Sequence, residues 1–95
     1  MINFEKIVGL QVITSDAHTL GEVKGARVDT RTWTIGFLNV KLADNSAIRL
    51  GMKKRFGSPT ISIPVSMVEA VSENVTISKS LEQLEHAKEI VEYKD

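Results

Sequence analysis

A strand pattern whose phase changes midway is the feature of this sequence that most constrains its fold. Within residues 22–29, Val23 shares one face of the expected strand with Gly25. Ala26 and Val28 share the opposite face. Because side chains alternate across a strand, a slip of one residue moves an entire apolar set to the other side. A β-bulge or sharp bend near Gly25 would bring both sets inside, and an isolated glycine in a strand often marks such a place.

The next expected strand, residues 33–42, changes phase in the same way. Its apolar side chains fall at odd positions in the first half and at even positions in the second half. Two consecutive strands of this kind are required by a strongly bent sheet, such as a barrel, but not by a flat one. The apolar side chains concerned are Trp33, Ile35, Phe37, Leu38, Val40 and Leu42.

Four more short strands complete the expected sheet, at residues 8–12, 61–65, 67–71 and 75–78. Pro64 cannot donate to a ladder, so it marks an edge or a strand exit. No helix of 10–15 residues separates the strands, which excludes a parallel sheet built from strand–helix–strand units. We therefore predict a mainly β fold: a small antiparallel β-barrel of about six short strands, closed or partly open.

A helical pattern begins at Ser80. Ser80 with Gln83 three residues later is a capping box, and apolar residues then recur at helical spacing over residues 80–93. The apolar stripe of this amphipathic helix must be covered by its own barrel or by a second chain. A small barrel offers little outer apolar surface, so oligomerisation is one hypothesis. The candidate oligomer contacts are Leu81, Leu84, Ala87 and Val91.

Length and composition limit the classes of protein to consider. The 95 residues predict one domain over 1–95, with the barrel at about 4–79 and the helix after it. Twelve acidic and twelve basic residues leave no basic excess of the kind that nucleic-acid binding usually requires. Absence of cysteine excludes disulfides and thiolate chemistry. Without a secretory signal or an apolar stretch of about 20 residues, we expect a soluble, cytoplasmic protein and no membrane insertion.

The order of short motifs resembles the PRC-barrel superfamily. The segments are residues 7–13, the Leu-Gly-Glu-Val step at 20–23, Val-Asp at 28–29, residues 35–40 and residues 63–71. The chain is similar to the short stand-alone archaeal members. The fold also occurs in the photosynthetic reaction-centre H subunit and in the ribosome-maturation factor. This resemblance implies a non-catalytic barrel used as an adaptor or assembly module. It also implies a structural role for Asp29, because the family places an acid there.

Catalytic and metal-binding patterns are weak. Ser15, Asp16 and His18 lie within four residues, whereas a catalytic triad converges from distant positions, so these are best explained as turn residues. His86 lies among acidic residues of the expected helix, which favours a surface ion pair. Two distant histidines and no cysteine do not suggest a metal site. We therefore expect no enzyme activity, no cofactor and no metal.

A basic loop is the main candidate for a binding site. Lys53, Lys54 and Arg55 precede Phe56, and Arg49 is close by. Three adjacent bases beside an aromatic ring could contact RNA phosphates and a base, or the acidic face of a protein. The more common alternative is a solvated loop with Phe56 tucked into the mouth of the barrel.

The preferred functional prediction is a protein-binding module that forms homo-oligomers and whose protein partner the sequence does not name. RNA or the ribosome is the second candidate, by analogy with the maturation factor. Trp33 is expected to plug a barrel end or to form a subunit contact, with the core position favoured. The residues expected to matter for structure are Gly9, Gly21, Gly25, Asp29 and Trp33.

Overall fold

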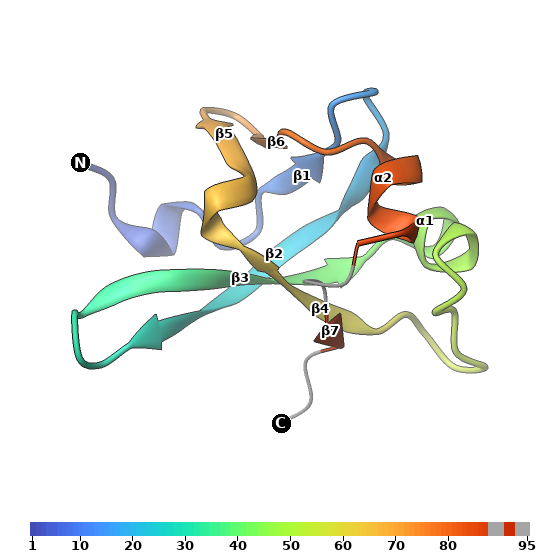
Figure 1. Ribbon diagram of the computed structural model, residues 1–95, viewed down its shortest axis with the longest axis horizontal. Coiled ribbons are helices and arrows are strands. Elements are labelled where there is room, and N and C mark those ends of the chain that lie inside the picture. Colours follow the sequence, from blue (N-terminus) through green and yellow to red (C-terminus); the bar gives the residue numbers. More distant parts are fainter. Residues whose placement is uncertain (88–90, 93–95) are drawn as a thin grey trace.

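The computed structural model describes residues 1–87 and 91–92 and confirms a mainly β fold (Figure 1). Within that part of the chain, seven strands form one mixed sheet in the order β5-β6-β1-β2-β3-β4-β7. The strands are β1 (Gln11–Ile13), β2 (Thr19–Asp29), β3 (Thr34–Leu42), β4 (Thr60–Pro64), β5 (Val68–Val71), β6 (Val75–Ile77) and the two-residue β7 (Val91–Glu92). The helices are the 3₁₀ turns η1 (Phe4–Lys6) and η2 (Val65–Met67), and the α-helices α1 (Asp44–Arg49) and α2 (Leu81–Glu85).

Of the closed or partly open barrel that the sequence predicted, the closed form is wrong, and so is the wholly antiparallel pairing. The sheet is open, with β5 and β7 as its two edges among the described strands. After β4 the chain passes through η2 and enters β5 at the edge of the sheet opposite to β7. β1 also pairs with β6 in parallel, Val12 opposite Val75. A parallel neighbour needs a long crossover, and here β2 to β5 supply it.

The bulge predicted near Gly25 is confirmed. β2 and β3 pair from Gly21↔Leu42 to Asp29↔Thr34, and the register shifts between Val23 and Gly25, leaving Lys24 as the extra residue. A second shift leaves Gly36 unpaired on β3, one position before the expected phase change at Phe37. Together the two bulges bend the ladder, as bulges do.

The core is one aliphatic cluster between the curved sheet and α2. Ala26 and Ile35 pack against it from the far ends of β2 and β3. The bulges therefore bring part of each second apolar set inward, but Val28 stays half exposed, contrary to expectation. The buried apolar side chains are Val12, Leu20, Val23, Leu38, Val40, Leu42, Ala47, Ile61, Ile63, Met67, Val75, Ile77, Leu81 and Leu84.

The helix after Ser80 is shorter than predicted. Its capping box is confirmed: the Gln83 N–H donates to Ser80 Oγ at 3.1 Å, and the Ser80 N–H donates to Gln83 Oε1 at 2.8 Å. However, α2 ends at Glu85, and Val91 pairs with β4 as part of β7, where a helix was expected. Pairing with the edge of β4 satisfies backbone groups that a continued helix would leave open on that strand. The remainder of the expected helix, residues 88–90 and 93, lies outside the described residues.

Two of the four candidate oligomer contacts are also corrected. Leu81 and Leu84 are buried in the core of their own chain, so they are not available to a second copy. The apolar stripe of α2 is thus covered from within, because the open sheet leaves a core face that a closed barrel would have sealed. Ala87 is half-buried. Val91 contributes its backbone to β7, and its side chain lies outside the described part of the structure.

Two strand ends differ from the sequence pattern for local reasons. The strand expected at 8–12 begins only at Gln11, since η1 precedes it and Gly9 turns the chain with φ of +94°. That conformation suits glycine, which agrees with the structural role predicted for Gly9. The strand expected at 61–65 ends at Pro64, after which Val65 enters η2.

Candidate functional site

The turn that holds Ser15, Asp16 and His18 serves the fold. Asp16 Oδ1 accepts two hydrogen bonds, one from the Thr14 hydroxyl with an O···O distance of 2.5 Å and one from the Leu81 backbone N–H with an N···O distance of 3.3 Å. His18 Nδ1 lies 3.2 Å from Asp16 Oδ2. The Thr14 hydrogen bond, helped by the Leu81 N–H and His18 against the cost of desolvation, lowers the pKa of Asp16 to about 2. Asp16 therefore ties the start of α2 to the β1–β2 turn, a role that a turn pattern alone did not reveal.

No cation site is visible in the part of the chain that the structure describes. Among residues 1–87 and 91–92, no three or more histidine, aspartate or glutamate side chains gather in a way that could hold a metal ion. None of the described helices is long and apolar enough to cross a membrane.

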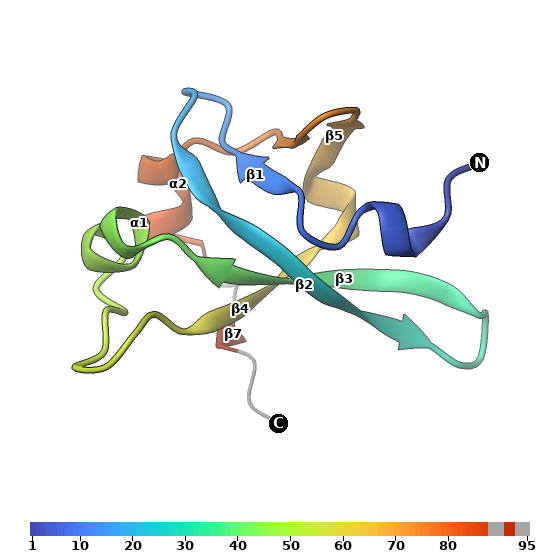
Figure 2. The same cartoon turned by 180° about the vertical axis from the view of Figure 1, so that it is seen from behind.

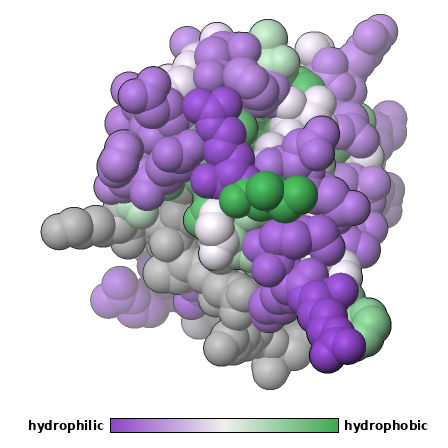
Figure 3. All heavy atoms as spheres, turned by 90° about the vertical axis from the view of Figure 1, so that its right-hand side faces the viewer, coloured by the Kyte–Doolittle hydropathy of each residue, from purple (hydrophilic) through white to green (hydrophobic). Residues whose placement is uncertain are grey.

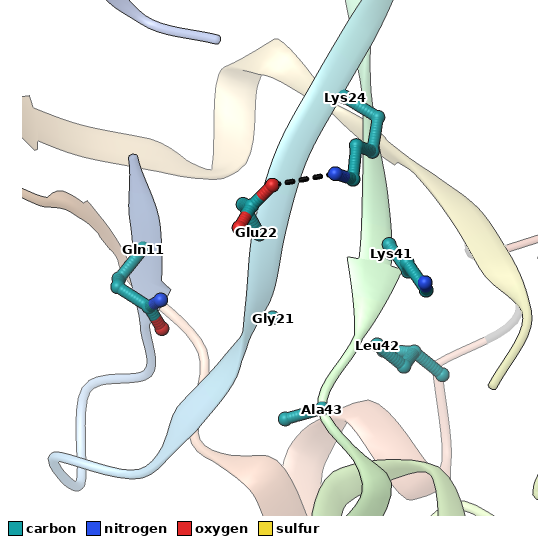
Figure 4. A pocket seen from close by; sticks show the side chains of 7 residues that line it. All are labelled: Gln11, Gly21, Glu22, Lys24, Lys41, Leu42 and Ala43. Carbon is teal, nitrogen blue, oxygen red and sulfur yellow. Dashed lines mark ion pairs between the residues drawn. The ribbon is translucent and has the colours of Figure 1, made fainter. Parts of the chain in front are cut away.

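A polar hollow lies over β1, β2 and β3, beside Gly21 (Figure 4). Gln11, Glu22 and Lys41 stand opposite one another on β1, β2 and β3. Lys24 Nζ lies 2.6 Å from Glu22 Oε2, and this hydrogen bond lowers the pKa of Glu22. Lys24 thus neutralises Glu22 from the same strand, and the charge of Lys41 on β3 also favours the ionised carboxylate. These interactions within the protein account for the charged side chains of the hollow without a ligand.

Gly21 is required by the approach of β3, as the sequence analysis expected. A Cβ added at Gly21 would lie 2.1 Å from the carbonyl oxygen of Lys41, far shorter than the 3.0 Å below which real Cβ atoms essentially never approach another atom. Asp29 has a local role too, because its Oδ1 accepts the backbone N–H of Arg31 at 2.9 Å in the β2–β3 turn.

Among the basic-loop candidates, Lys53 and Arg49 make hydrogen bonds that support the fold. Lys53 Nζ donates to the carbonyl oxygens of Lys54 and Gly57, at 3.1 and 2.8 Å, and so holds the loop closed. Arg49 Nε donates to Glu85 Oε1 at 2.9 Å and links α1 to α2. These contacts make the two side chains structural in the isolated chain.

The tip of the same loop is exposed. Phe56 is 87 % exposed, so the expectation that it tucks into the barrel mouth is wrong. The Arg55 guanidinium lies 5.5 Å from the centre of the Phe56 ring. Figure 3 shows this side of the molecule, which is mostly hydrophilic with small, separate hydrophobic patches. The loop tip is therefore a small cation–aromatic surface rather than part of a broad apolar face.

A second exposed surface lies at the far end of the β2–β3 hairpin, which sequence analysis did not single out. We call residues 26–36 the hairpin arm. β1 pairs with β2 only as far as Val23, and β4 pairs with β3 only from Phe37 onward. The arm therefore extends beyond both neighbours as a two-stranded ribbon, which Figures 1 and 2 show projecting from the body of the sheet.

The arm exposes large apolar side chains. Trp33 is 78 % exposed and Val28 is 49 % exposed, so the core position favoured for Trp33 is wrong. Trp33 follows the turn with φ of +56°, a left-handed conformation that costs about 1–2 kcal/mol for a residue with a Cβ. Arg27 covers the Phe37 ring at 5.1 Å on the other face. A hairpin with an apolar tip that none of the described elements covers is suited to contact with another protein.

Comparison with models of known protein families finds no match, and comparison with curated proteins finds no relative. Membership of the PRC-barrel superfamily therefore stays a prediction from the sequence motifs.

Proposed function

We propose that this chain is a non-catalytic adaptor or assembly module that acts through protein–protein contacts and associates with itself. The observation that supports the proposal is the hairpin arm, with Trp33 at its tip and Val28 on its flank. The resemblance to PRC barrels points in the same direction, since that family uses the barrel as an adaptor.

The hairpin arm has little to stabilise it on its own. An isolated two-stranded hairpin is marginally stable in water, and this one has no strand beside either edge among the described residues. Exposed tryptophan is unusual on a free surface and frequent at the centre of interfaces, where it contributes much of the binding energy. Covering the arm with a partner would bury Trp33 and stabilise the ribbon at once.

Affinity capture from native extract tests the proposal. The wild-type chain is compared with Trp33→Ser, and Phe56→Ser serves as a matched control because it removes an equally exposed aromatic ring elsewhere. We expect partner proteins to be captured by wild type and by the control and to be lost with Trp33→Ser. Equal capture by all three, with circular dichroism showing each folded, would contradict a role for the arm.

RNA binding through the loop tip is the second candidate function. The exposed Phe56 ring with Arg55 beside it is the kind of stacking surface that single-stranded nucleic acid uses. If the loop contacts RNA, replacing Lys54, Arg55 and Phe56 by alanine should abolish binding to a labelled single-stranded RNA. Each lost phosphate contact should also reduce the slope of log K against log salt by about 0.7. Absence of binding by wild type at low salt would remove this candidate.

A further inference from the structure

We infer that the outer edge of β2 in the hairpin arm pairs with the same edge of a second copy, about a two-fold axis through Val28. The inference rests on the proposed function and specifies one partner for it, a second copy of this chain.

The first support is an open strand edge. The last hydrogen bonds on the outer side of β2 are made by Val23, whose carbonyl oxygen accepts from the Gly9 N–H and whose N–H donates to the Leu10 carbonyl oxygen. Beyond Val23, no described strand pairs with that side of β2 up to its end at Asp29. In Figures 1 and 2 no other ribbon runs along this edge. Unpaired N–H and C=O groups on such an edge are a template for another strand.

The second support is the register that symmetry allows. A two-fold axis normal to the sheet leaves each side chain on the same face of the sheet. Directly opposite residues of two antiparallel strands also share a face, so the axis must lie midway between one residue and its own copy. An axis through Val28 sets Val28 opposite its own copy. It also sets Arg27 opposite the second copy's Asp29, twice by symmetry. On one face of the two paired β2 strands the valines then contact each other, and on the other face each arginine lies opposite an aspartate. Both are favourable arrangements for cross-strand neighbours.

Neighbouring registers are worse on the same criteria. An axis through Arg27 sets two arginines opposite each other, and an axis through Asp29 sets two aspartates opposite each other. An axis through Ala26 sets Val28 opposite Lys24 and gives the arginine no acidic partner. The edge is therefore complementary to itself in one register.

The groups concerned are accessible in the single chain. Val28 is 49 % exposed and the side chain of Asp29 is 40 % exposed. Arg31 lies 3.7 Å from Asp29 and is itself 90 % exposed, so this weak contact leaves the carboxylate within reach of a second chain. Ala26 and Ile35 continue the core along the same side as Val28, and pairing extends that apolar stripe across the axis.

A charge-swap experiment tests the register. Wild type is expected to form a weak dimer by sedimentation velocity between about 1 µM and 1 mM, the span suited to a small interface. Arg27→Asp alone opposes acid to acid and Asp29→Arg alone opposes base to base, so each should raise the dimer dissociation constant at least tenfold. Mixed together, the two variants should form a one-to-one heterodimer, because every pair then joins an acid and a base. Folded variants that fail to associate on mixing would overturn the register, as would single variants that dimerise like wild type.

A disulfide provides an independent check. The chain has no cysteine, so Val28→Cys introduces one thiol. Opposite residues of an antiparallel pair have Cα atoms about 4.5–5.5 Å apart, within the range of a disulfide. Val28→Cys should therefore oxidise to a covalent dimer much faster than Val71→Cys, the control at a comparably exposed position on β5. Equal rates, or a wild type that remains monomeric throughout, would overturn the inference. The proposed function would survive that result if the arm still captured a different protein.

Discussion

Replacing Gly21 with alanine should strongly destabilise the fold, because β3 passes too close to leave room for a methyl group. The added Cβ would lie 2.1 Å from the Lys41 carbonyl oxygen and 2.8 Å from its carbonyl carbon. Ordinary contact begins at 3.4 Å, so β2 and β3 must separate locally by roughly 1 Å in a close-packed ladder. Overpacking costs about 1–3 kcal/mol when side chains can adjust, and here the obstacle is backbone. We expect a loss of about 2–4 kcal/mol, a large part of the roughly 5–14 kcal/mol typical of this chain length.

Urea unfolding followed by circular dichroism measures this loss. With a slope near 1.5 kcal/mol/M, the midpoint of Gly21→Ala should fall by about 2 M. Gly36→Ala is the matched control, because a Cβ there meets nothing within 4 Å. The control should change the free energy of unfolding by less than about 1 kcal/mol. If the two variants unfold at the same urea concentration, the close approach of the strands does not explain the need for glycine.

Three further predictions concern polar contacts. The pKa of Asp16 is about 2 in the folded chain against an ordinary 3.8, so the stability that its carboxylate contributes is present above pH 4 and is lost as pH falls through 2. Asp16→Asn should therefore lower the free energy of unfolding at pH 7, and acid titration should show that this free energy depends less on pH between 4 and 2. Ser80→Ala removes the capping box and should cost about 1 kcal/mol by urea unfolding, whereas Ser80→Asp should retain most of it. Asn39→Leu leaves the buried Ser62 hydroxyl without its 2.8 Å partner and should cost about 1–3 kcal/mol, and adding Ser62→Ala should recover part of that loss in a double-mutant cycle.

Features that depend on neighbouring residues were predictable from the sequence. The bulge at Gly25 follows from alternation along a single strand, and the capping box from a spacing of three residues. The connection between Asp16 and Leu81 was not predictable, because the two residues are 65 positions apart and meet only when α2 docks on the β1–β2 turn.

The exposure of the candidate binding residues was not predictable from the sequence either. Hydropathy favoured burial for both Trp33 and Phe56, yet both are exposed, since no described segment covers the ends of their hairpin and loop. Leu81 and Leu84 were assigned to an oligomer contact because a closed barrel would leave them no cover. The open sheet gives them one.

The sequence alone therefore determined the β class, the bend of the central hairpin and the start of α2, because side-chain alternation and end capping are local properties. Only the tertiary structure decided that the described strands form an open sheet and that β1 and β6 pair in parallel. It also decided that no described segment covers the hairpin arm. Each of these depends on which distant segment packs against which face, and that is decided by competition among the many ways of burying the same apolar side chains.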